Sequence, residues 1–153
     1  MKVLAIDPAT VTGWAHSCGE SGVWDCSLKK DESSGMRLLR FRSKLNEVKN
    51  LIGVDVVAFE AGSRGQRNNR ALVVQLEIQG VLKEWCEAER IQYVSYSPHE
   101  IKKHALQDVD GKKRTKEKMV QAACNKWPDL NIVDDNHADA LHLLDLAMKD
   151  LNL

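Results

Sequence analysis

Residues 2–14 read KVLAIDPATVTGW, in which four apolar residues, Val3–Ile6, run directly into one carboxylate, Asp7. This pattern is typical of a buried strand that delivers a charged side chain to its open end. Pro8 removes a backbone donor and ends the strand, and Gly13 allows the chain to turn back. A buried charge is costly unless a partner neutralises it, so we expect Asp7 to meet a cation, for which a metal ion is one candidate.

A second stretch repeats this arrangement, because residues 54–60 read VDVVAFE and end on Glu60. Two strands of this kind in one small protein are more informative than one. If the two strands are neighbours in a sheet and end on the same edge, Asp7 and Glu60 meet there.

Residues 134–141 read DDNHADAL and supply the other candidate carboxylates. On a helix, Asp135 and Asp139 are four residues apart and share a face, which apolar residues continue toward the C-terminus. If the apolar part of that face packs on the sheet, its acidic end lies near the edge where Asp7 and Glu60 are expected.

A group of three or four carboxylates without Lys or Arg among them cannot stay fully ionised unless cations bind. Hard divalent ions with oxygen ligands, Mg²⁺ or Mn²⁺, are the natural partners. Two such ions about 4 Å apart can activate a water molecule and stabilise the leaving oxygen of a phosphodiester.

The rest of the chain predicts an α/β fold with a five-stranded mixed sheet. After the first strand, further strands are expected at 11–15, 22–28, 54–60 and 91–96, and helices at 36–51, 71–89, 98–106, 115–127 and from about 134 to the C-terminus. Three consecutive strands at the start favour an antiparallel meander, and the helices can cover both faces of the sheet. A length of 153 residues is typical of one domain.

The composition is that of a globular protein, with 43% hydrophobic and 29% charged residues. No apolar run is long enough to span a membrane, and the charged residues near the start do not resemble a signal peptide. The net charge is zero, but residues 102–118 hold seven Lys or Arg against three acids, whereas residues 129–153 hold six Asp against one Lys. A basic surface beside an acidic pocket suits a protein that binds a polyanion and also holds cations.

The chain resembles the RuvC family of Holliday junction resolvases, and the resemblance covers nearly its whole length. Three motifs in this order carry it: Ala5-Ile6-Asp7-Pro8 with Gly13-Trp14, Phe59-Glu60, and Ala138-Asp139-Ala140-Leu141. The resemblance implies an RNase H-like fold and a single nuclease domain over residues 1–153. The compact middle of the chain resembles the phage-encoded branch more than the bacterial one.

The resemblance also implies a Mg²⁺- or Mn²⁺-dependent endonuclease that cuts branched DNA, above all four-way junctions, with two ions per active site. It makes Asp7, Glu60 and Asp139 catalytic metal ligands. The products would carry a 3′-hydroxyl and a 5′-phosphate.

The fourth catalytic ligand departs from the family pattern. Many members carry an Asp or His three residues before the last Asp, where this chain has Asn136. We expect Asp135 to fill this role because it shares a helix face with Asp139. Asn136 and His137 are further candidate ligands.

Several basic residues are candidate DNA contacts, some through the resemblance and some through their place after Glu60. They are Arg64, Arg67, Arg70, Lys102, Lys103, Lys112, Lys113, Arg114, Lys116 and Lys118. The family cuts as a homodimer, and the resemblance places the helix 71–89, with Gly80, at or near the interface. We expect no membrane and no nucleotide cofactor, and a location in the bacterial cytoplasm, including that of an infected host.

Three alternatives remain open at this point. A junction- or single-strand-binding module without catalysis is compatible with Asn136. An actin-like ATPase also begins with an Asp after an apolar strand, but this sequence has no second Gly-rich phosphate loop. A ribonuclease of the same fold would differ by cutting RNA–DNA hybrids.

Overall fold

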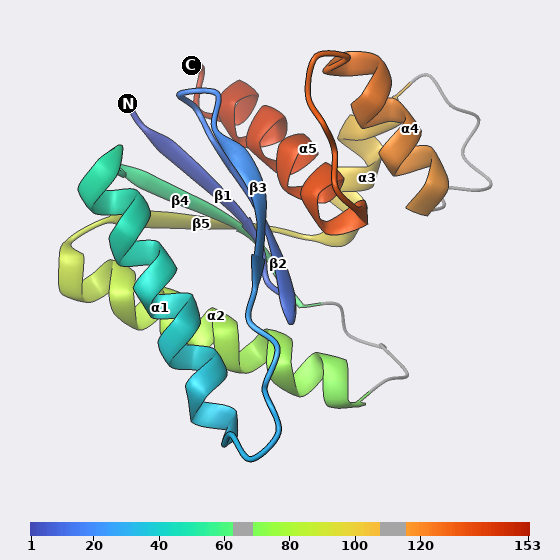
Figure 1. The fold of residues 1–153 in the computed structure, drawn as a ribbon. Coiled ribbons are helices and arrows are strands. Elements are labelled where there is room, and N and C mark those ends of the chain that lie inside the picture. Colours follow the sequence, from blue (N-terminus) through green and yellow to red (C-terminus); the bar gives the residue numbers. More distant parts are fainter. Residues whose placement is uncertain (63–68, 108–115) are drawn as a thin grey trace.

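A five-stranded sheet with helices on both faces forms the framework of the protein (Figure 1). The computed structural model describes residues 1–62, 69–107 and 116–153. Its strands are β1 (Val3–Asp7), β2 (Val11–His16), β3 (Ser21–Asp25), β4 (Val56–Glu60) and β5 (Gln92–Tyr96). Its helices are α1 (Ser34–Leu51), α2 (Asn69–Glu89), α3 (Pro98–Ala105), α4 (Lys116–Lys126) and α5 (Asp135–Asp150). The predicted α/β class and order of elements are confirmed, and the predicted helix start at Thr115 lies outside the described residues.

The order of the strands brings the ends of β1 and β4 together. Across the sheet the order is β3-β2-β1-β4-β5, with β1, β2 and β3 antiparallel and β4 and β5 parallel to β1. In this register Ile6 lies opposite Phe59, so the next residues, Asp7 and Glu60, reach the same edge side by side. The expected neighbouring of these two strands is therefore confirmed.

The pleat of the sheet decides which face each side chain of β1 joins, because successive side chains point to opposite faces. Leu4 and Ile6 pack in the core beneath α1 and α2. Val3 and Ala5 pack in the core on the side of α3, α4 and α5. Asp7 follows Val3 and Ala5 in this alternation and therefore faces α5.

The same alternation holds in β4. Val57 and Phe59 belong to the core beneath α1 and α2, whereas Ala58 belongs to the core beneath α5. Glu60 follows Ala58 and faces α5 as well. The two strands thus present both carboxylates to one helix.

Burial of large apolar side chains holds each helix layer on the sheet. Phe41 of α1 and Trp85 of α2 are fully buried, and each contributes about 1.5–3 kcal/mol by leaving water. The indole nitrogen of Trp85 donates to the side-chain oxygen of Asn46 at 2.8 Å, so burial leaves no unpaired donor there. On the other face, Leu143 of α5 is fully buried against β1.

Side-chain caps define where α5 and α3 begin. The first of these helices carries the acidic residues, and the second carries Lys102 and Lys103. The Asp134 carboxylate accepts a hydrogen bond from the backbone N–H of His137 at 2.8 Å and caps α5. Ser97 and Glu100 form a reciprocal capping box at the start of α3. Among the described helices, none combines the length and the apolar character that crossing a membrane requires.

Candidate metal centre

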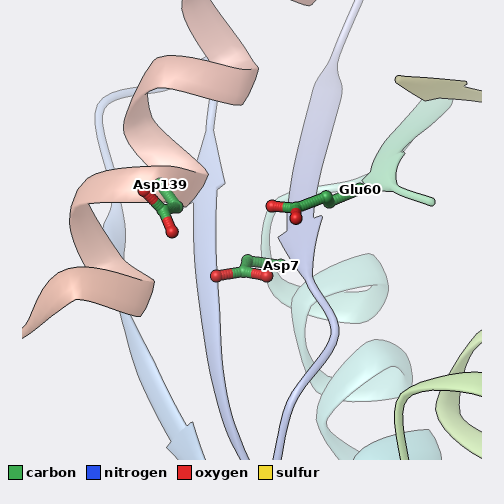
Figure 2. A group of neighbouring side chains, drawn as sticks. All are labelled: Asp7, Glu60 and Asp139. Atoms are coloured by element: carbon green, nitrogen blue, oxygen red, sulfur yellow. The ribbon is translucent and has the colours of Figure 1, made fainter. Parts of the chain in front are cut away.

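Three carboxylates meet at the sheet edge where β1 and β4 end (Figure 2). Asp7 ends β1, Glu60 ends β4, and Asp139 lies in the second turn of α5. One oxygen from each carboxylate lies within 4.8 Å of the others. Ligand oxygens about 2.1 Å from one Mg²⁺ are at most about 4.2 Å apart, so three oxygens within 4.8 Å of one another are near the spacing that one ion requires.

Burial and mutual repulsion disfavour ionisation of these three groups. The pKa of Asp7 is raised well above its usual value, first by burial and then by the charge of Glu60. Burial raises the pKa of Glu60 to about 6, against a lowering effect of Lys102. The pKa of Asp139 rises to about 7, first through burial and then through repulsion by Glu60 and Asp135. Near neutral pH the cluster therefore holds protons unless a cation replaces them.

The donor set fits a hard divalent cation. All three groups offer carboxylate oxygens, which Mg²⁺ and Mn²⁺ prefer. In the part of the chain that the structure describes, none of the three forms an ion pair within 4.0 Å. Asp7 is only 6% exposed, so its charge is poorly solvated. Bound metal ions would supply the missing positive charge.

Asp135 lies in the same pocket but not in the cluster of three. The pocket has a volume of about 660 Å³, and Asp135 and Asn136 line it together with the three clustered carboxylates. The Asp135 carboxylate pairs with the Lys116 ammonium at 3.2 Å, and this contact raises the pKa of Lys116. Lys116 is therefore the counter-ion of Asp135, the carboxylate that we expect to be the fourth metal ligand.

His137 does not face this pocket. Its Nδ1 accepts a hydrogen bond from the Val133 backbone N–H at 3.1 Å, and its Nε2 lies 2.9 Å from the Ser21 hydroxyl of β3. The side chain is 3% exposed, and burial lowers its pKa. The structure therefore separates His137 from the other candidate ligands, since its ring points away from Asp139.

Gly13 has a different role from the one its sequence suggests. It lies inside β2, opposite Asp7, and not at a turn, so the expected reversal at Gly13 is wrong. A Cβ atom added to Gly13 would lie 1.9 Å from the backbone oxygen of Asn136. The absence of a side chain lets the first turn of α5 approach β2 this closely.

Replacing Gly13 with Ala is expected to lower the free energy of unfolding by roughly 3 kcal/mol, because the first turn of α5 must move away from β2. Chemical denaturation at equilibrium measures this change. The matched control is Gly35→Ala, where the nearest described atom to an added Cβ is the Ser33 hydroxyl oxygen at 3.9 Å. Equal stability of the two variants would contradict the close approach.

Basic residues also line the acidic pocket. Lys102 of α3 and Lys116 of α4 both line it. Lys103, Lys118 and Arg70 are also described by the structure, and none of these three lines the pocket. The other candidate DNA contacts, Arg64, Arg67, Lys112, Lys113 and Arg114, lie outside the described residues.

Two glutamines of α2 border the site without having been predicted from the sequence. Gln75 and Gln79 are each 6% exposed, and Gln75 lines the acidic pocket. The Gln79 amide donates to the backbone oxygen of Glu60 at 3.2 Å and so holds the end of β4. The signal in the sequence is two amides four residues apart on an otherwise apolar helix face.

Comparison with solved structures identifies this architecture. A scan against protein-family models finds no match, and neither does a search of curated proteins. Thermus thermophilus RuvC in complex with a Holliday junction substrate superposes with a TM-score of 0.74, at 18% identity, covering 94% of this chain and 90% of RuvC. This chain has the RuvC fold.

Two further structures support the same assignment. A second Thermus thermophilus RuvC structure matches with a TM-score of 0.74 and 16% identity, covering 99% of this chain and 97% of that chain. The yeast mitochondrial Holliday junction resolvase Ydc2 matches with a TM-score of 0.60 and 14% identity, covering 96% of this chain and 78% of that chain. The RuvC fold confirms the predicted RNase H-like architecture.

Proposed function

We propose that this chain is a structure-selective endonuclease that resolves four-way DNA junctions by metal-dependent hydrolysis of phosphodiesters, as one nuclease domain over residues 1–153. The observation that carries the proposal is the meeting of Asp7, Glu60 and Asp139 at one sheet edge of a RuvC fold. A buried acidic cluster with basic residues at its border suits a polyanionic substrate. One of the RuvC structures that this chain resembles is a complex with a Holliday junction substrate.

In this proposal Asp7, Glu60 and Asp139 hold Mg²⁺ or Mn²⁺, with Asp135 as the fourth catalytic carboxylate. Two bound ions would supply a Lewis acid and a lowered pKa for the attacking water. Asn136 also lines the pocket, and its amide would offer a neutral oxygen there. Asp7 and Glu60, fixed by neighbouring strands, orient the site with respect to the sheet.

The DNA backbone would lie along the basic border of the pocket. Lys102 and Lys116 stand beside the carboxylates and can reach phosphates that flank the cleaved one. Lys103, Lys118 and Arg70 would extend this contact. Selection of junctions would come from DNA shape, since backbone contacts carry no sequence information.

We also propose a homodimer formed through α2. Val73 and Leu76 of α2 are each 52% exposed, although large apolar side chains are usually buried. Gly80 follows on the same helix, and an added Cβ there would meet no atom of the described residues within 4 Å. Two copies could approach closely along this face and place one acidic pocket on each DNA strand.

Leu76→Asp is expected to convert the dimer to a monomer, because two carboxylates would meet in an apolar interface. Sedimentation equilibrium should then report 17.2 kDa in place of twice this mass. Leu39→Asp is the matched control, since Leu39 is 59% exposed on α1. A wild-type protein that already sediments as a monomer would contradict the dimer.

The deciding experiment is cleavage of a labelled synthetic four-way junction in Mg²⁺, Mn²⁺ or EDTA. Linear duplex and RNA–DNA hybrid serve as control substrates. Paired nicks on the junction alone, absent in EDTA, are expected. Binding without nicks under any metal would favour the non-catalytic module, which Asn136 keeps open, and cleavage of hybrids would favour a ribonuclease.

The proposal places the protein in the bacterial cytoplasm, including that of an infected host, and in the phage-encoded branch of its fold relatives. It requires branched DNA as partner and neither a nucleotide cofactor nor a membrane.

A further inference from the structure

His137 links the start of α5 to β3, the strand at one edge of the sheet. Its Nδ1 accepts from the Val133 N–H at 3.1 Å, just before the helix, while its Nε2 contacts the Ser21 hydroxyl of β3 at 2.9 Å. Its own backbone N–H donates to the Asp134 cap at 2.8 Å. One buried residue therefore joins the segment before the helix, the helix itself and a strand 116 residues away.

The hydrogen bonds fix the tautomer of the ring. Because a backbone N–H can only donate, Nδ1 of His137 must carry a lone pair. The proton of the neutral ring is then on Nε2, and Ser21 accepts it. Each ring nitrogen has one partner, so the ring orientation is determined from both sides.

The position of His137 in the helix relates this contact to the acidic pocket. Residues two apart on a helix point in nearly opposite directions, so a ring directed at β3 turns Asp135 and Asp139 toward the pocket. Gly13 supplies a second, independent restraint, since it lets Asn136 approach β2 directly. Together these contacts leave the first turn of α5 little freedom to rotate or slide.

We propose that His137 is a positioning residue, which through Ser21 and Val133 sets the distance of Asp139 from Asp7 and Glu60. This inference rests on the proposed metal site and goes beyond it, because it gives a role to a residue that binds neither metal nor DNA.

Two substitutions at His137 separate the two hydrogen bonds of its ring. His137→Asn keeps an acceptor near the Nδ1 position but cannot reach Ser21, and His137→Gln keeps a donor near the Nε2 position but loses the acceptor for Val133. Ser21→Ala removes the contact on the sheet without changing α5. His142→Asn is the matched control, because His142 is equally buried on α5 but bonds to the backbone oxygen of Met119 on α4.

The readout is the dissociation constant for Mn²⁺, measured by isothermal titration at a temperature well below the unfolding transition of every variant. We expect Ser21→Ala and His137→Asn to weaken Mn²⁺ binding about tenfold, the lower end of the effect of groups that orient metal ligands. His142→Asn should lower the melting temperature and leave Mn²⁺ affinity unchanged. Junction cleavage should fall with metal occupancy and recover at high Mn²⁺ concentration.

Wild-type Mn²⁺ affinity in both Ser21→Ala and His137→Asn would overturn the inference. It would show that the hydrogen bonds of the His137 ring do not affect the metal-binding carboxylates. An equal loss of affinity in His142→Asn would also overturn it, since general loosening of α5 would then be the cause. A failure of the proposed function can be distinguished from a failure of this inference. If the wild type binds Mn²⁺ but leaves junctions intact, the role of His137 can still be measured from metal affinity alone.

Discussion

Asp7→Asn is expected to abolish junction cleavage and, in the absence of metal, to stabilise the protein. Asp7 is 6% exposed and faces Glu60 and Asp139, so its charge is unfavourable unless a cation is bound. The amide is similar in shape and uncharged. We expect the free energy of unfolding in EDTA at pH 8 to rise, because the substitution removes a buried charge that the neighbouring carboxylates repel.

The same substitution removes a ligand from the proposed metal site. A loss of several kcal/mol of transition-state stabilisation corresponds to a decrease of about 10³-fold in cleavage rate. Denaturation in EDTA and single-turnover cleavage in Mg²⁺ measure the two effects. Asp7→Asn should raise the stability of the metal-free protein and lower the cleavage rate, a combination that an ordinary core substitution does not produce.

Asp25→Asn is the matched control for both measurements. Asp25 is exposed, its pKa is lowered by hydrogen bonds from Ser27, and it lies at the end of β3, two strands away from β1. We expect no gain in stability and unchanged cleavage. A destabilised Asp7→Asn protein in EDTA would contradict the unfavourable charge at Asp7.

The metal-free protein is expected to be more stable at pH 5 than at pH 8. The pKa of Glu60 rises to about 6 and that of Asp139 to about 7 in the folded state, above the ordinary values of 4.5 and 3.8. Between the unfolded-state and folded-state pKa values, the folded state binds more protons than the unfolded state, so stability falls as pH rises. Lys102 and Lys116 oppose the rise in the pKa of Asp139 but do not cancel it.

The expected difference is at least about 2 kcal/mol, or roughly 4–8 °C in melting temperature for a protein of this size. Thermal unfolding in EDTA across this pH range measures it. The control is an Asp7→Asn/Asp139→Asn double variant, whose melting temperature should depend less on pH. Mn²⁺ should oppose this loss at high pH, raising stability by about 2.7 kcal/mol at one hundred times its dissociation constant. An identical slope in wild type and double variant would assign the pH dependence to other groups.

Local sequence patterns predict much of this fold. The apolar runs ending in Asp7 and Glu60 indicate two buried strands, and the spacing of Asp135 and Asp139 indicates one helix face. These patterns depend only on neighbours in the chain. The element order and the mixed sheet follow from them and agree with the structure.

The remaining features depend on contacts between distant segments. Gly13 appears as a turn residue in sequence because the approach of Asn136 is visible only when α5 is packed on β2. The ring of His137 is directed away from the pocket by Ser21, 116 residues earlier. The pairing of Asp135 with Lys116 requires α4 to lie beside α5. None of these partners is marked by a local pattern.

The alternation of side chains along β1 and β4 imposes a parity rule on changes in chain length. Inserting or deleting one residue inside β1 would turn Asp7 from the face of α5 to the face of α1 and α2, placing a carboxylate among apolar side chains. The acidic cluster would lose a member and the core would gain a charge in one event. Length variation among related proteins should therefore be confined to connections such as residues 26–33, between β3 and α1, while β1 and β4 keep their length.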